Sequence, residues 1–350
     1  MWKGIIRQYP DFYRFANEDH IVTLLEGNTP LIPVPRLAAK IKPGISVYLK
    51  YEGLNPSSSF KDRGMTLAVS RAIEAGSNSI ICASTGNTSA SAAAYAARAG
   101  ISAFVLIPEG KIALGKLAQA MIHGAIVIKV LGNFDEALKL VREISDNYPV
   151  TLVNSLNPHR IEGQKSAAFE VCDALGEAPD YHCLPVGNAG NITAYWAGYK
   201  VCKDAGRIKS LPKMFGFQAE GAAPIVLGHV VENPETVATA IRIGNPASWK
   251  GAEAARDESG GLIDMVSDQE ILEAYQLAAS TEGVFCEPAS AASIAGLIKK
   301  SREGYFETGS KIVCTLTGHG LKDPDNAIKV SKDPVICEPE MKKVLDVLGF

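Results

Sequence analysis

The segment SSSFKDRG, Ser57–Gly64, places one lysine where its amine could act as a nucleophile. Lys61 follows a loop and begins a stretch whose helical pattern continues to Ala75. A lysine cation is disfavoured at a helix N-terminus because the helix dipole is positive there, so the pKa of this amine should fall. An amine of lowered pKa can form a Schiff base with a carbonyl compound. Asp62 and Arg63 can pair with each other or with neighbours, which leaves Lys61 free to point elsewhere. The alternative is a solvated run of charges.

A second polar turn begins where a predicted strand ends at Ala83. It contains the hydroxyls of Ser84, Thr85 and Thr88 and the amide of Asn87. An alanine-rich helical pattern follows, and the positive N-terminus of that helix would favour a carboxylate or a phosphate. The same residues could instead form an ordinary helix N-cap in a serine- and threonine-rich turn.

A third turn follows the predicted strand YHCLPV and begins a helix. It consists of Gly187, Asn188, Ala189, Gly190 and Asn191. Such small residues let several backbone amides converge on one anion. The turn is neither a Walker loop nor a GxGxxG motif, so a phosphate monoester suits it better than a dinucleotide. A tight structural turn is the alternative.

A fourth turn, TGHG, follows the predicted strand KIVCTL. Thr317 ends this strand, and its hydroxyl could contact a ligand or bond to the backbone. His319 lies between two glycines, where a place in a turn is the better interpretation than a general base. The sequence has no HExxH motif and no paired metal-ligand spacing, so we expect no metal site. It also lacks the GxSxG motif of serine hydrolases.

The elements that must position these turns follow an α/β pattern. Strand-like segments occupy residues 46–52, 79–84, 101–108, 125–131, 151–155, 181–186, 213–220 and 311–318, with helical patterns between most of them. This alternation predicts two three-layer α/β domains with largely parallel sheets and helices on both faces. We expect a large domain of residues 1–52 and 151–350 and a small mobile domain of residues 53–150. Ligands of such sheets bind at the carboxyl ends of the strands, where the turns lie.

Composition limits the class of protein. The 350 residues are 47% hydrophobic and 21% charged, which is ordinary for a soluble globular protein. A net charge of −3 gives no reason to expect nucleic acid or an acidic membrane as a partner. The seven cysteines form no CxxC pair, which favours reduced thiols. We expect a cytosolic protein, because no signal peptide or membrane-spanning stretch is apparent.

Several motifs resemble, in their order, one family of pyridoxal-phosphate enzymes. They are EGNTPL (26–31), NPSSSFKDRGM (55–65), STGNTSAS (84–91), GNAGNITAYW (187–196), CEPASAAS (286–293) and LTGHGLKDP (316–324). The order resembles fold type II, the tryptophan-synthase-β-like enzymes, and within it the threonine synthases over nearly the whole chain. One departure is visible: the family usually reads NPTGSFKDRG, whereas Ser57 and Ser58 stand in this loop.

The resemblance implies a cofactor site for pyridoxal 5′-phosphate. Lys61 would be the Schiff-base lysine, and Asn87 would bond to the 3′-oxygen of the cofactor. The segment from Gly187 to Asn191 would hold the cofactor phosphate, and Thr317 would meet the pyridine nitrogen. A neutral hydroxyl at that nitrogen makes the ring a restrained electron sink, which suits elimination and replacement better than transamination.

The implied substrate is O-phospho-L-homoserine, which reacts with water to give L-threonine and phosphate. We expect Ser84, Thr85 and Thr88 to bind its carboxylate. The resemblance assigns its phosphate to Lys116, Asn154, Ser155 and Arg160, although Lys116 could be a surface residue of its helix. The alternatives are a threonine or serine dehydratase, a cysteine synthase, and a non-catalytic protein that binds a phosphorylated metabolite. Related enzymes are commonly homodimers, so we expect a homodimer.

Overall fold

The computed structural model contains two β-sheets and describes residues 1–109, 114–331 and 333–350, with backbone alone for 114–116, 134 and 135. The six-stranded sheet has the order β1 (Leu31–Pro33), β2 (Ser46–Tyr51), β10 (Lys311–Leu316), β7 (Tyr181–Pro185), β8 (Lys213–Ala219) and β9 (Leu262–Val266). The four-stranded sheet has the order β5 (Ile126–Val130), β4 (Ser102–Pro108), β3 (Ser79–Ala83) and β6 (Thr151–Leu152). Every strand pairs in parallel except β1, which is antiparallel to β2. The α/β class and the largely parallel sheets are therefore confirmed.

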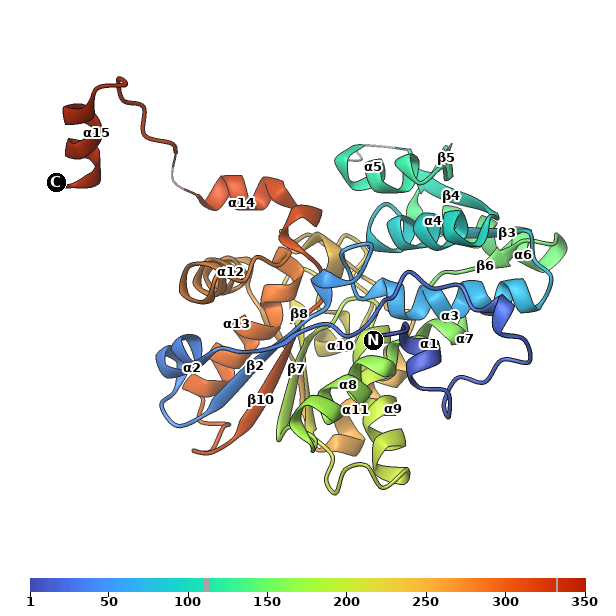
Figure 1. The fold of residues 1–350 in the computed structure, drawn as a ribbon, viewed down its shortest axis with the longest axis horizontal. Coiled ribbons are helices and arrows are strands. Elements are labelled where there is room, and N and C mark those ends of the chain that lie inside the picture. Colours follow the sequence, from blue (N-terminus) through green and yellow to red (C-terminus); the bar gives the residue numbers. More distant parts are fainter. Residues whose placement is uncertain (110–113, 332) are drawn as a thin grey trace.

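Helices cover both faces of both sheets (Figure 1). On the six-stranded sheet, α2 (Pro35–Ile41), α12 (Asp268–Glu282) and α13 (Pro288–Arg302) pack on one face. The other face carries α1 (Ile5–Gln8), α8 (Ser166–Leu175), α9 (Gly190–Asp204) and α11 (Trp249–Ser259). On the four-stranded sheet, α3 (Lys61–Glu74), α4 (Asn87–Ala99) and α5 (Leu114–Ile122) lie opposite α6 (Phe134–Asn147). The remaining α-helices are α7 (Pro158–Gln164), α10 (Pro224–Leu227), α14 (Pro324–Val330) and α15 (Met341–Leu348).

Short 3-10 helices complete the chain at η1 (Glu18–His20), η2 (Glu52–Leu54), η3 (Thr239–Ile241) and η4 (Gly320–Lys322). All eight predicted strands exist, and the prediction missed β1 and β9. The boundary expected at residue 150 falls just before β6, which pairs with β3 of the four-stranded sheet. That sheet therefore continues to Leu152. The division into two domains and the mobility of the smaller one stay predictions.

Helices α3 and α7 pack closely because glycines lie at their crossing. A Cβ on Gly163 of α7 would lie 2.0 Å from the carbonyl oxygen of Arg63 on α3. No side chain fits at that distance, so only glycine permits this approach. The close crossing brings Arg160 of α7 to the same cavity as Lys61 of α3.

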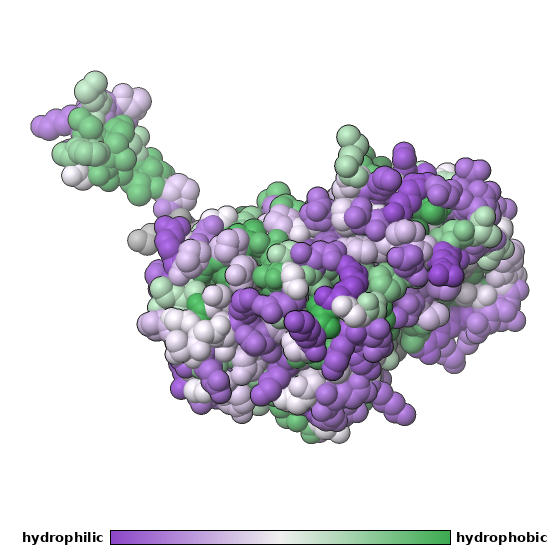
Figure 2. Space-filling view, turned by 60° about the horizontal axis from the view of Figure 1, so that its bottom comes forward, coloured by the Kyte–Doolittle hydropathy of each residue, from purple (hydrophilic) through white to green (hydrophobic). Residues whose placement is uncertain are grey.

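The C-terminal segment leaves the body of the molecule, and α15 stands apart from it (Figure 1). In the space-filling view, hydrophilic side chains dominate the visible face of the body, and apolar ones gather on this helix (Figure 2). Its exposed apolar side chains include Val347, Leu348 and the nearby Phe350. In the described part of the chain, no helix is both long and apolar enough to cross a membrane.

Candidate active site

A cavity of about 900 Å³ lies where the predicted turns meet. It is lined by Lys61, Ser84, Thr85, Asn87, Thr88, Asn154, Ser155, Arg160, Gly187, Asn188, Ala189, Gly190, Asn191 and Thr317. These residues follow the carboxyl ends of β2, β3, β6, β7 and β10, as expected for ligand sites of parallel sheets. The remaining predicted residue, Lys116, lies on α5, and its side chain is outside the described part of the structure. One cavity thus collects all the other predicted residues.

Lys61 is the first residue of α3 and reaches the cavity from a loop fixed to the end of β10. The backbone N–H of Phe60 donates to the carbonyl of Thr317 at 3.0 Å, and a β-bridge joins Ser59 to Gly318. The Lys61 ammonium nitrogen lies 4.3 Å from the centre of the Phe60 ring. Desolvation lowers the pKa of Lys61 to about 7, with a further contribution from the charge of Arg160. A large fraction of this amine is therefore uncharged at neutral pH.

The charges beside Lys61 are buried, so the alternative of a solvated charge run is wrong. Asp62 accepts hydrogen bonds from the backbone N–H of Ser57 at 2.6 Å and from the Ser91 hydroxyl at 2.6 Å. Burial raises the pKa of Asp62 to about 6, although these hydrogen bonds oppose the shift. Asp62 therefore ties the lysine loop, residues 55–60, to α4, and in the described structure it forms no ion pair with Arg63.

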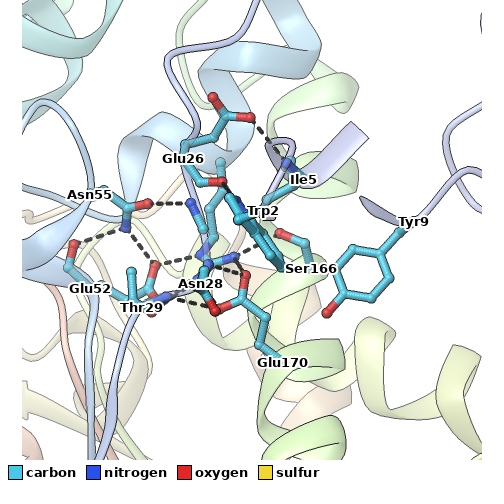
Figure 3. Close-up of polar contacts among 12 residues, drawn as sticks. Trp2, Ile5, Tyr9, Glu26, Asn28, Thr29, Glu52, Asn55, Ser166 and Glu170 are labelled. Carbon is cyan, nitrogen blue, oxygen red and sulfur yellow. Dashed lines mark hydrogen bonds and ion pairs between the residues drawn. The ribbon is translucent and has the colours of Figure 1, made fainter. Parts of the chain in front are cut away.

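Arg63 is buried in a compact ion cluster, and Figure 3 shows the two carboxylates of this cluster, Glu52 and Glu170. Its guanidinium donates to both carboxylate oxygens of Glu52, at 2.6 and 2.8 Å, and of Glu170, at 2.6 and 2.7 Å. Lys50 donates to Glu170 at 2.7 Å and balances the remaining charge. Burial alone would raise the pKa of Glu170, but Arg63 and Lys50 hold it well below its usual range. This cluster fixes the start of α3 and so the position of Lys61.

The GNAGN turn, Gly187–Asn191, leads directly into α9, and no side chain caps the N-terminus of this helix. A Cβ on Gly187 would lie 2.8 Å from the Cα of Ile241, so this close approach requires glycine. Ala189 has φ 63° and precedes α9 without a side-chain cap. The side-chain nitrogen of Asn191 is buried and has no partner in the part of the chain that the structure describes. The turn thus offers unused donors to an anion, as an anion nest requires.

The start of α4 is also open toward the cavity. Gly86 occupies the N-cap position, and no side chain caps the helix there. The ordinary N-cap interpretation of this turn is therefore wrong. Ser84 accepts a hydrogen bond from the backbone N–H of Gly86 at 3.2 Å, which shapes the turn. Thr85 and Thr88 line the same side of the cavity.

Glu287 is a cavity residue for which the sequence analysis proposed no role, although it lies in the quoted CEPASAAS motif. It is buried at the N-cap of α13 and accepts from Asn87 at 3.1 Å and from the Thr317 hydroxyl at 2.9 Å. Burial raises the pKa of this carboxyl. Ser290 lies 3.0 Å from the Thr317 hydroxyl oxygen. One carboxyl thus links the two side chains expected to contact the cofactor ring.

The residues expected to bind the substrate phosphate differ in how many of their hydrogen-bonding atoms are still free to contact a ligand. Asn154 uses its amide oxygen and nitrogen on the backbone of Ala83, at 2.9 Å each, and so joins β6 to the end of β3. Ser155 accepts from Asn188 at 3.2 Å. Arg160 donates to the carbonyl of Val153 at 2.7 Å, but its Nε and Nη2 have no partner. Burial lowers the pKa of Arg160 to about 10.

The turn interpretation of His319 fits the structure. Its Nδ1 accepts from the backbone N–H of Leu321 at 3.1 Å, and its ring stacks on Tyr51 with centroids 6.0 Å apart.

Ser58 stands where the family usually has glycine, and its φ of 67° lies in the left-handed region. The departure therefore adds backbone strain to the lysine loop.

Comparison with known proteins identifies the family of this chain. Residues 22–318 match the family model described as pyridoxal-phosphate dependent enzyme. Threonine synthase of Synechocystis sp. is 57% identical over 351 residues, covering 100% of this chain and 91% of the relative. Threonine synthase of Halalkalibacterium halodurans is 58% identical, covering 99% and 97%. The processed form of threonine deaminase isoform 2 from Solanum lycopersicum has the same fold, with a TM-score of 0.76 at 21% identity over 93% of this chain and 92% of that one. The chain belongs to the pyridoxal-phosphate dependent enzyme family, among its threonine synthases.

Proposed function

We propose that this chain converts O-phospho-L-homoserine and water into L-threonine and inorganic phosphate, with pyridoxal phosphate as its cofactor. One observation carries the proposal: a single cavity combines the Lys61 amine with three groups suited to anions. These groups are the GNAGN turn, the uncapped start of α4, and the unpaired guanidinium atoms of Arg160. The reaction has three anionic groups to bind, namely the cofactor phosphate, the substrate carboxylate and the substrate phosphate, so each can have a site of its own.

This match also separates the proposal from its nearest rival. A threonine or serine dehydratase acts on a substrate that has a carboxylate but no phosphate. Such a substrate would leave the Arg160 donors without an acceptor. An unpaired buried charge of this kind costs free energy. A substrate phosphate gives Arg160 the charged acceptor that its planar donor group favours.

The cavity fits pyridoxal phosphate on chemical grounds. A cofactor phosphate at the GNAGN turn would supply acceptors for the α9 N-terminus and for the unpartnered Asn191 nitrogen. Leaving such a donor buried and unpaired costs about 1–3 kcal/mol, so binding an acceptor is favourable. Lys61 would hold the aldehyde of the cofactor, Asn87 its 3′-oxygen and Thr317 its ring nitrogen.

The chain's own residues supply the proton transfers and the substrate contacts. When bound, the cofactor supplies an electron sink that stabilises negative charge at the Cα of an amino acid. Lys61 has a pKa of about 7, so its Nζ can hold or release a proton near neutral pH. We assign to Lys61 proton removal at Cα and then at Cβ of the substrate. Arg160 and Ser155 would hold the phosphate that leaves Cγ, before water adds at Cβ.

The same proposal covers water exclusion and assembly. The small unit, residues 53–150, would close over bound substrate, because carbanionic chemistry requires protection from stray water.

We also expect a homodimer in the cytoplasm, with no nucleic acid or membrane as partner. The cysteines are free thiols, and Cys337 alone among them is exposed, which is consistent with a reducing compartment. Light scattering on the purified protein measures the oligomeric state.

Replacing Lys61 tests the central assignment. Lys61→Ala should lose the visible absorbance of the bound cofactor and release phosphate from O-phosphohomoserine at least about 10³-fold more slowly, because its amine is both attachment point and base. Lys139→Ala, on the exposed face of α6, is the control and should match wild type. Ketobutyrate formation from threonine, measured in parallel, would identify a dehydratase. Unchanged absorbance in Lys61→Ala would contradict the assignment.

The lowered pKa of Lys61 gives the cofactor capture a pH dependence. Only the uncharged amine attacks an aldehyde, and the folded pKa of about 7 lies below the usual lysine value of 10.5. The rate at which cofactor-free protein captures pyridoxal phosphate should therefore rise through pH 7 and level off above about pH 8. Stopped-flow absorbance measures this rate. A rate that continues to rise steeply to pH 10 would show an unperturbed lysine.

A further inference from the structure

Lys322 belongs to the LTGHGLKDP motif but has no role in the proposed reaction. It ends η4, directly after the turn that carries Thr317, and it lines the same cavity. Its ammonium donates to the backbone carbonyl of Ser57 at 3.1 Å and to the side-chain oxygen of Gln119 at 2.5 Å. Lys322 therefore joins the lysine loop to α5, which are separate segments of the cavity wall.

Gln119 connects this contact to the substrate side of the cavity. It lies on α5 three residues after Lys116, and residues three apart share one face of a helix. Ala118 and Gln119 line the cavity, while Leu117 is buried in the core shared with α4. A bond that holds Gln119 toward the cavity thus holds the face of α5 on which Lys116 lies.

The charge of Lys322 suits a tether more than a base. Burial lowers the pKa of this amine, and the nearby carboxylates of Glu287 and Asp62 oppose this shift only in part. Both of its hydrogen-bond partners are neutral oxygens that accept, one from backbone and one from an amide. An ammonium forms such bonds more strongly than a neutral donor.

We propose that Lys322 is a positioning residue that holds α5 against the lysine loop, so that the face of α5 that carries Ala118 and Gln119 keeps its place in the wall of the substrate cavity. The inference rests on the proposed function, since it concerns the same substrate. It assigns Lys322 no contact with the reacting atoms. The tether should therefore act on substrate binding and on the order of α5, with little effect on the chemical step.

The first test needs no activity. Hydrogen exchange of the α5 amides is measured in the purified wild-type protein and in Lys322→Met and Gln119→Leu. Loss of a charged hydrogen bond should speed exchange across residues 117–122 about tenfold in either variant. The double variant should add little to either single change, because both remove the same bond. Lys329→Met is the control: Lys329 also borders the cavity, but it is exposed and makes no hydrogen bond to α5 in the described structure.

Steady-state kinetics form the second test. Lys322→Met and Gln119→Leu should raise the KM for O-phosphohomoserine about tenfold with kcat within about twofold, and Lys322→Arg should keep KM within about threefold. Unchanged α5 exchange in Lys322→Met would overturn the inference. An equal rise of KM in Lys329→Met would also overturn it, because net cavity charge would then explain the effect. If wild type releases no phosphate, the proposed function fails, while the exchange data still decide the tether.

Discussion

Arg63 and Arg160 are both buried and lie on two helices, α3 and α7, that pack together, yet their bonding is opposite. The Arg63 guanidinium bonds to two carboxylates and two hydroxyls. Among the described residues, Arg160 donates only to one backbone carbonyl, and its Nε and Nη2 lack partners. The pKa of Arg63 is raised well above its usual value by Glu170 and Glu52 against the effect of burial, whereas burial lowers that of Arg160 to about 10.

The difference separates scaffold from ligand site. Two cations, Arg63 and Lys50, and two carboxylates, Glu52 and Glu170, make the Arg63 cluster neutral, and the donors of both cations are satisfied within the protein. In the cavity, by contrast, hydrogen-bond donors outnumber the acceptors that the described residues offer them. These donors are the side chains of Arg160 and Asn191 and the backbone N–H groups at the uncapped starts of α4 and α9. Buried polar groups normally have partners, so this excess marks where an anionic ligand supplies them. Replacing each arginine should therefore have different consequences.

The largest effect on folding is expected for Arg63→Met. It leaves Glu52 and Glu170 as uncompensated buried charges, which should lower the free energy of unfolding by about 3–5 kcal/mol. Urea denaturation of cofactor-free protein measures this. Arg71→Met, which removes a partly exposed pair with Glu74 on the same helix, should cost no more than about 1 kcal/mol. Equal losses in the two variants would show that the buried cluster is no special scaffold.

Arg160→Met should separate stability from function. The variant removes a buried charge that has little compensation, so the unfolding free energy of the ligand-free protein should change by less than about 1 kcal/mol. The KM for O-phosphohomoserine should rise about 100-fold, because a charged partner of the substrate phosphate is lost. Denaturation and phosphate-release kinetics on the same preparation test both parts. A large loss of stability with unchanged KM would make Arg160 a second scaffold residue.

Sequence patterns predicted the parts of this site that follow central strands. The turns after β3, β7 and β10 come directly after apolar runs, and parallel strands bring such turns to one edge; Lys61 follows β2 through a loop. The strands that the patterns missed, β1 and β9, are both sheet edges. One has three residues and contains Pro33, and the other contains Asp264, which pairs with Lys300. Edge strands tolerate such residues, which weakens their apolar pattern.

Contacts between distant segments explain what the sequence did not reveal. Glu287 meets Asn87 across 200 positions of sequence, and Lys322 meets Gln119 across 203. No local pattern encodes a pairing of this kind. Arg63 in the segment Lys61–Arg63 likewise pairs with Glu52 and Glu170, which lie elsewhere in the sequence. The segment alone therefore could not show whether Lys61 is solvated.

The smallest expected effect concerns the loop that joins the two regions. Ser58 has φ 67°, and a non-glycine residue pays roughly 1 kcal/mol for that conformation. Ser58→Gly should therefore raise the free energy of unfolding by up to about 1 kcal/mol, although the more flexible unfolded glycine chain offsets part of the gain. Ser210→Gly, in an exposed loop outside the left-handed region, should instead be neutral or slightly destabilising. Urea denaturation compares the two variants, and equal changes would mean that the strain at Ser58 is relieved elsewhere. Arg160, Asn191 and the ion cluster are untouched in both, so KM should stay within about twofold of wild type, although Ser58 also lines the cavity.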